Sequence, residues 1–247
     1  MPIADYFIYA ILGLAPSLIW LLFYLHKDNR PEPKKIVLQV FLLGALMGPV
    51  AILLQLISRW ACSPTTDWAL FVNTLGQNDN RFFLNIIIFA PLTEEFLKFI
   101  VVRWRVLKNP AFDEPFDAML YLIISALGFA AVENLLYIFL MPELTLSNAL
   151  SQTLARFLSA TFLHTLASGI LGFFLAISWL KFKERKIIFA GGFILVTVIH
   201  GFYNYLAWLI DANGFYSFGL MALIVTLGGV VHWQLHDLKN KSSVCKI

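Results

Sequence analysis

Seven long apolar segments constrain the fold of this chain more than any other feature of its sequence. Each holds about 20 predominantly apolar residues, the length that an α-helix needs to cross about 30 Å of hydrocarbon. A water-soluble globule of this size has too little interior to bury the apolar surface of a chain that is 60% hydrophobic and 13% charged. The predicted spans are residues 3–25, 36–58, 82–102, 116–140, 158–180, 187–208 and 215–235.

The connections between these segments are short and polar, and the sequence contains no internal repeat or low-complexity stretch. We therefore expect an all-α fold, a polytopic membrane helix bundle with about seven transmembrane helices. These helices form a single integral membrane domain over residues 1–247. The lipid bilayer is the expected surrounding partner, and the composition argues against nucleic-acid binding.

Lysine and arginine are distributed unevenly between the two sides of this predicted bundle. Of the 18 basic residues, 14 fall in one set of alternate connections and three in the other, while Lys98 lies inside the third span. Basic residues are enriched in the cytoplasmic connections of membrane proteins. The sequence therefore predicts that the N-terminus lies outside and the C-terminus in the cytoplasm.

Four of the predicted spans carry ionisable or amide side chains, which are costly in lipid unless they are paired or hydrated. Their positions along the spans indicate similar depths in the membrane, so all of them can belong to one site. The residues are Glu94, Glu95 and Lys98 in the third span, Glu133 and Asn134 in the fourth, His164 in the fifth, and His200 and Asn204 in the sixth.

Each of these residues also has a purely structural explanation. Glu94 and Lys98 are four positions apart and can form an ion pair within one helix. A single buried histidine most often bonds to a backbone carbonyl, and Asn134 or Asn204 can link two helices by hydrogen bonds. Three carboxylates and two imidazoles at one depth nevertheless exceed what the packing of seven helices requires, which favours a functional site.

Glutamate and histidine at this depth are suited to hydrolysis of a peptide bond. One glutamate can act as general base on a water molecule, while histidine or asparagine stabilises the oxyanion. In a second scheme, His164, His200 and Glu133 hold a divalent metal such as zinc, and another glutamate is the base. Both schemes stay open, and so does the choice between Glu94 and Glu95, because adjacent helical residues point about 100° apart.

Three blocks of sequence then carry a resemblance to the PrsW family of intramembrane proteases. Together with His164, His200 and Asn204 they form a similar pattern over residues 26–208. The blocks are residues 94–98 (EEFLK), 112–119 (FDEPFDAM) and 128–137 (GFAAVENLLY).

This resemblance implies a protease of the superfamily that contains CAAX endopeptidases and bacteriocin-immunity proteins. It implies a bacterial inner or plasma membrane location and a single-span membrane protein as substrate, in the named case an anti-sigma factor cut on the outer side. The implied catalytic residues are Glu94, Glu95, His164 and His200, with Glu133, Asn204, Lys98 and Asn134 in support.

Three other functions are compatible with the same residues. Carboxylates and histidines inside a membrane also build the proton relays of ion-coupled transporters, although no pair of interrupted spans recurs in two halves of this chain. A CAAX-type prenyl endopeptidase would need a cleft that faces the cytoplasm. A non-catalytic scaffold or immunity protein would tolerate the loss of His164 and His200.

Overall fold

The computed structural model describes residues 3–63, 67, 71 and 80–241, and within them every regular element is a helix. The all-α prediction is therefore confirmed. The elements are α1 (Ile3–His26), α2 (Lys34–Ala61), α4 (Asn80–Leu84), the π-helix η1 (Asn85–Phe89), α5 (Ala90–Arg105), α6 (Pro115–Phe139), α7 (Leu146–Leu158), α8 (Ala160–Leu180), the 3₁₀-helix η2 (Phe182–Glu184), α9 (Arg185–Ala212) and α10 (Tyr216–Lys239).

Six stretches of the described chain are long and apolar enough to cross a membrane. They correspond to all the predicted spans except the third, residues 82–102, which is divided among α4, η1 and α5. The amphipathic helix α7 was not predicted, and it continues into α8 with a break at Ser159. The chain is thus a multi-pass membrane protein whose third hydrophobic segment differs from the others.

Helix α6 is the centre of the bundle. It is apolar on all sides, and such a helix is stable only where neighbours cover its whole circumference. Helices α1, α2, α5, α7, α8 and α10 all pack against it. Residues 116–131 of α6 are all buried. The polar residues Glu133 and Asn134 follow directly on this buried segment.

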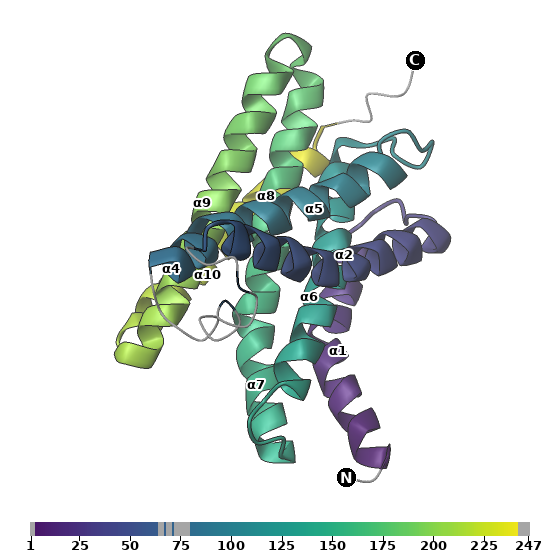
Figure 1. The fold of residues 1–247 in the computed structure, drawn as a ribbon. Coiled ribbons are helices and arrows are strands. Elements are labelled where there is room, and N and C mark those ends of the chain that lie inside the picture. Colours follow the sequence, from purple (N-terminus) through teal and green to yellow (C-terminus); the bar gives the residue numbers. More distant parts are fainter. Residues whose placement is uncertain (1–2, 64–66, 68–70, 72–79, 242–247) are drawn as a thin grey trace.

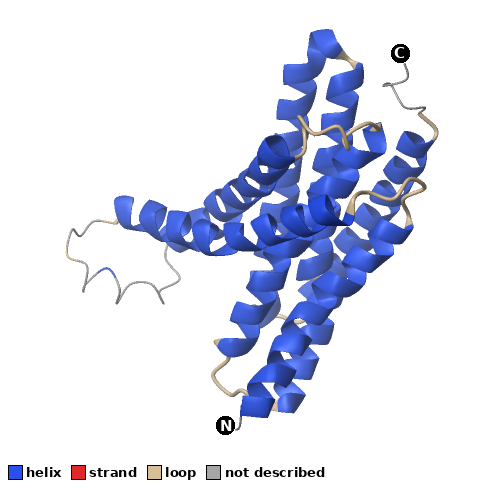
Figure 2. Ribbon diagram, turned by 90° about the vertical axis from the view of Figure 1, so that its right-hand side faces the viewer, coloured by secondary structure: helices blue, strands red, loops and turns tan. Residues whose placement is uncertain are grey.

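Helices α2 and α5 pack against each other and run across the long helices α6 and α8 instead of along them (Figures 1 and 2). The crossing of α2 with α6 depends on two glycines that let the backbones touch. A Cβ atom on Gly44 would lie 2.2 Å from the carbonyl oxygen of Ser125, and one on Gly128 would lie 2.0 Å from that of Phe41. Side chains of any size would separate these helices.

We expect Gly128→Ala to destabilise the fold by about 1–3 kcal/mol, because the added methyl group collides with backbone atoms that cannot rotate away. The measurement is the unfolding midpoint of the purified protein in a detergent titration. Gly191→Ala is the matched control, since a Cβ atom there meets nothing within 4 Å. Equal stability of both variants would contradict the proposed close contact of α2 with α6.

The connection between α1 and α2 lies at the same end of the bundle as the start of α6 and the end of α10. Arg30 forms an ion pair with Glu114 at 2.5 Å, and the ammonium of Lys239 donates to the carbonyl of Lys27. We call this end, which also carries the α8–α9 connection, the basic end. The first turn of α1 and the last turn of α10 lie at opposite ends of the bundle (Figure 1).

Candidate active site

The interruption of the third hydrophobic segment begins at Pro91, which has no N–H to donate. In η1 the hydrogen bonds follow the wider π-helical spacing, and the N–H of Ala90 bonds to the carbonyl of Asn85. In the same spacing the donor to the carbonyl of Ile86 would be residue 91, and proline has no N–H. The side-chain amide of Asn204 supplies the missing hydrogen bond at 3.0 Å. Helix α9 is thereby attached to η1, about two turns before the two glutamates of α5.

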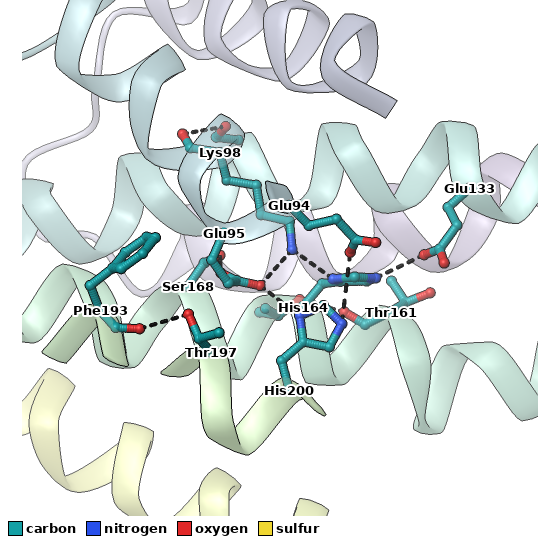
Figure 3. A network of polar contacts seen from close by, with 12 residues as sticks. Glu94, Glu95, Lys98, Glu133, Thr161, His164, Ser168, Phe193, Thr197 and His200 are labelled. Carbon is teal, nitrogen blue, oxygen red and sulfur yellow. Dashed lines mark hydrogen bonds and ion pairs between the residues drawn. The ribbon is translucent and has the colours of Figure 1, made fainter. Parts of the chain in front are cut away.

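Glu95 and Lys98 form a fully buried ion pair at the centre of the site. The ammonium nitrogen of Lys98 lies 2.7 Å from Oε1 of Glu95, and both side chains are 0% exposed. The same Oε1 accepts a hydrogen bond from Nδ1 of His200 at 3.0 Å, and Oε2 accepts one from Ser168 at 3.1 Å. The Glu95 carboxylate is therefore occupied by three donors from α5, α8 and α9 (Figure 3).

His164 links this ion pair to a second carboxylate on α6. Its Nδ1 atom accepts from the ammonium of Lys98 at 2.7 Å, which leaves the proton on Nε2, and Nε2 donates to Glu133 at 2.8 Å. Glu133 also pairs with the guanidinium of Arg156 at 2.9 Å. His164 thus lies between two ion pairs, Lys98 with Glu95 and Arg156 with Glu133.

Glu94 differs from Glu95 because most of its hydrogen-bonding capacity is unused. Its Oε1 atom accepts from the side-chain amide of Gln55 at 3.1 Å, whereas Oε2 is buried and has no hydrogen-bond partner among the described residues. That oxygen lies 3.7 Å from Nε2 of His200, whose other nitrogen, Nδ1, contacts Glu95. The unsatisfied oxygen of Glu94 and the outer nitrogen of His200 therefore face each other beside the ion pair.

Two cavities meet at Glu94 and Glu133. One has a volume of about 470 Å³ and is mostly apolar, with walls from α2 and α6 that include Gly48, Ala51 and Leu136. The other has a volume of about 600 Å³ and contains most of the polar groups of the site. Glu95 lines neither cavity. The residues that line the second cavity include His164, His200, Asn204, Arg156 and Tyr203.

The donor atoms around the second cavity fit a divalent metal. Glu94, His164 and His200 each offer one ligand atom, and these atoms lie within 4.8 Å of one another. Two imidazoles and one carboxylate are a common set of zinc ligands, and a carboxylate that accepts from the outer nitrogen of a histidine, as Glu95 does, orients such ligands. His164 is already bonded at both nitrogens and would release one partner on binding.

The structure brings six of the residues singled out in the sequence into one network: Glu94, Glu95, Lys98, Glu133, His164 and His200. Three details differ from expectation. Lys98 pairs with Glu95, not Glu94. Asn204 bonds to the carbonyl of Ile86 and so links two helical segments, the structural alternative given for it above. Glu133 pairs with Arg156, and the three ligand atoms that lie together are those of Glu94, His164 and His200.

Asn134 takes the structural role of linking helices. Its amide donates to Thr161 at 3.0 Å, and its oxygen accepts from Nε of Arg156 at 2.6 Å. Sequence reasoning missed Arg156, Gln55 and Ser168 as members of the site. Arg156 lies just before the predicted span 158–180 and is one of only three basic residues on that side of the bundle, which is the one signal that the sequence offers for it.

We expect Arg156→Met to lower kcat by about 10- to 100-fold, because Arg156 holds the carboxylate that orients His164. Arg156→Lys should recover part of the rate, since it restores the charge without the second hydrogen bond to Asn134. The checks are kcat and KM of the purified variants, with Lys35→Met at an exposed position as control. A loss confined to stability, with kcat unchanged, would leave Arg156 without a positioning role.

Comparison with known proteins identifies the family. The model of the PrsW family, described as intramembrane metalloproteases, matches residues 32–230. Protease PrsW of Geobacillus kaustophilus is 30% identical over 85% of this chain and 84% of its own length. Protease PrsW of Oceanobacillus iheyensis is 28% identical over 92% and 93%, and that of Bacillus subtilis is 24% identical over 87% and 90%.

No solved structure shows significant similarity to the chain. The relatives give no support to the transporter or to the CAAX-type alternative. The chain therefore belongs to the PrsW family of intramembrane proteases, and it is a multi-pass membrane enzyme of the hydrolase class.

Proposed function

We propose that this enzyme hydrolyses a peptide bond of a single-span membrane protein in the bacterial cell membrane. Its N-terminus lies outside and the basic end faces the cytoplasm, in agreement with the distribution of lysine and arginine. The active site is the pair of cavities around Glu94 and Glu133. An anti-sigma factor is the substrate that the resemblance to the family favours.

One observation carries the assignment of the reacting groups. Oε2 of Glu94 has no hydrogen-bond partner among the described residues and lies 3.7 Å from Nε2 of His200, which is an acceptor in the neutral tautomer with the proton on Nδ1. Two acceptors at this separation can both bind the hydrogens of one water molecule. Glu94 is then the general base, which takes a proton as the water oxygen attacks the scissile carbonyl and later returns it to the leaving nitrogen.

The other residues of the network position Glu94 and His200 or stabilise the charge that develops beside them. Glu95 holds His200 in the tautomer with a free Nε2 atom, and Lys98 neutralises Glu95. His164 and the arginine-bound Glu133 form the opposite wall, where positive charge from Arg156 can stabilise a developing oxyanion. The apolar cavity between α2 and α6 accommodates the side chains of the substrate.

A divalent metal would be held by Glu94, His164 and His200. When bound, it would polarise the substrate carbonyl and make the water more acidic. Glu133 lines the same cavity and would then be the carboxylate that accepts the proton.

The test is cleavage of tagged single-span membrane proteins by the purified chain in liposomes. We expect defined fragments, and we expect alanine at Glu94, Glu95, His164 or His200 to abolish them without affecting membrane insertion. The same preparations are analysed for metal, with roughly one ion per chain expected in the wild type and none in His200→Ala if the metal scheme holds. Cleavage that persists in all four variants, or proton flux without cleavage, would refute the proposal.

A further inference from the structure

A separate cavity lies at the basic end, beside the C-terminal half of α5. It has a volume of about 620 Å³ and lies between the end of α5, the end of α8 and the beginning of α9. It shares no lining residue with either active-site cavity. Its polar wall is formed mainly by three cations: Arg103, Arg185 and Lys186.

These three cations are not neutralised by the protein. No aspartate or glutamate lines the cavity. Among the residues that the structure describes, Arg103 and Lys186 have no ion pair, and Arg185 contacts only the ring of Phe182, at 5.4 Å. All three are exposed and line one cavity, so an anion in that cavity would meet three positive charges without an acidic competitor.

The start of α9 adds to this positive field. Its N-cap residue, Glu184, makes no side-chain cap hydrogen bond, and the first turn contains no acidic residue. The N-terminus of a helix carries partial positive charge, so Arg185 and Lys186 occupy the turn where basic residues are least favourable. An anionic ligand supplied from outside the chain would offset this cost.

The other walls of the cavity are apolar. Phe99 and Leu175 are buried beneath it, and Phe189 closes one side. The rim continues onto side chains that face the surroundings, since Phe182 is 73% exposed and the adjacent Ile187 is 79% exposed. A ligand that fits this site combines an anionic group with a hydrocarbon part that extends along the rim.

We propose that this cavity binds an anionic phospholipid, with the phosphate between Arg103, Arg185 and Lys186 and an acyl chain along Phe182 and Ile187. Basic pockets between helices at the cytoplasmic side of a membrane protein are suited to such headgroups. Orientation in the membrane requires basic residues in the connections, but it does not require three of them to converge on one cavity. This site is independent of the proteolytic reaction.

The experiment measures lipid binding to the full chain in detergent by native mass spectrometry, with phosphatidylglycerol and phosphatidylcholine as probes. The test variant combines Arg103→Gln, Arg185→Gln and Lys186→Gln. The control combines Lys34→Gln, Lys35→Gln and Lys108→Gln, which removes the same charge from exposed positions outside the cavity. Circular dichroism establishes that both variants keep the helical content of the wild type.

We expect phosphatidylglycerol to bind more tightly than phosphatidylcholine to the wild type and to the control. Each cation near an anionic headgroup contributes about five-fold in affinity, so the test variant should bind phosphatidylglycerol on the order of 100-fold more weakly. Equal losses in the test and control variants would mean attraction to net charge and would overturn the proposal. Displacement of the lipid by millimolar inorganic phosphate would also overturn it, because the site would then recognise the free anion.

Discussion

Glu94→Gln is expected to lower the rate of peptide-bond cleavage by about 10²- to 10⁴-fold, the contribution of a well-placed general base. The amide keeps the size of the carboxylate but cannot accept a proton. Its Oε1 atom can still accept from Gln55, so the fold should not change. The measurement is the initial rate of substrate cleavage at saturating substrate, alongside the unfolding midpoint of the same preparation.

Glu143→Gln is the matched control, because it makes the same chemical change at an exposed position after α6. Its rate should equal that of the wild type. If Glu94→Gln keeps more than about a tenth of the rate, Glu94 is not the base. A full loss in Glu95→Gln alone would then transfer that role to the paired carboxylate.

Lys98→Met is expected to destabilise the fold by about 3–5 kcal/mol, the usual cost of leaving a buried charge without its partner. Glu95 would remain fully buried, with only a serine and an imidazole as donors. The methionine side chain fills a similar volume, so the loss would arise from charge and not from a cavity. Detergent unfolding followed by circular dichroism measures the effect.

The double variant Glu95→Gln with Lys98→Met removes both charges, and it should recover most of the lost stability. It should not recover cleavage, because His200 would lose the carboxylate that orients it. Lys34→Met, at an exposed position, controls for the loss of one positive charge. A single variant as stable as the wild type would show that the ion pair is not a structural element of this protein.

The helices could be predicted from the sequence because their cause is local. A run of about 20 apolar residues has few alternatives in lipid, where each backbone N–H must bond within its own helix. Six of the seven predicted spans are long apolar helices in the structure, as expected. The sequence also indicates that the third span differs from the others. Pro91 removes a backbone hydrogen-bond donor, and three charged residues follow it within two turns.

The missed features depend on packing between distant segments. Arg156 is an ordinary basic residue in sequence, and only the continuation of α7 into α8 brings it to Glu133 and Asn134. Lys98 is equally able to reach either glutamate along one helix. The position of His200 and Ser168 around Glu95 decides which carboxylate becomes the paired one.

The sequence by itself determined that this chain is a membrane-embedded helical bundle and that its few buried charges have a common depth. Hydrophobic length and the cost of isolated charges in lipid are sufficient for both conclusions. Only the tertiary structure decided that Glu95 is neutralised and Glu94 faces the cavity. That distinction depends on angles of about 100° between neighbouring side chains and on contacts from α8 and α9, which no pattern along one helix contains.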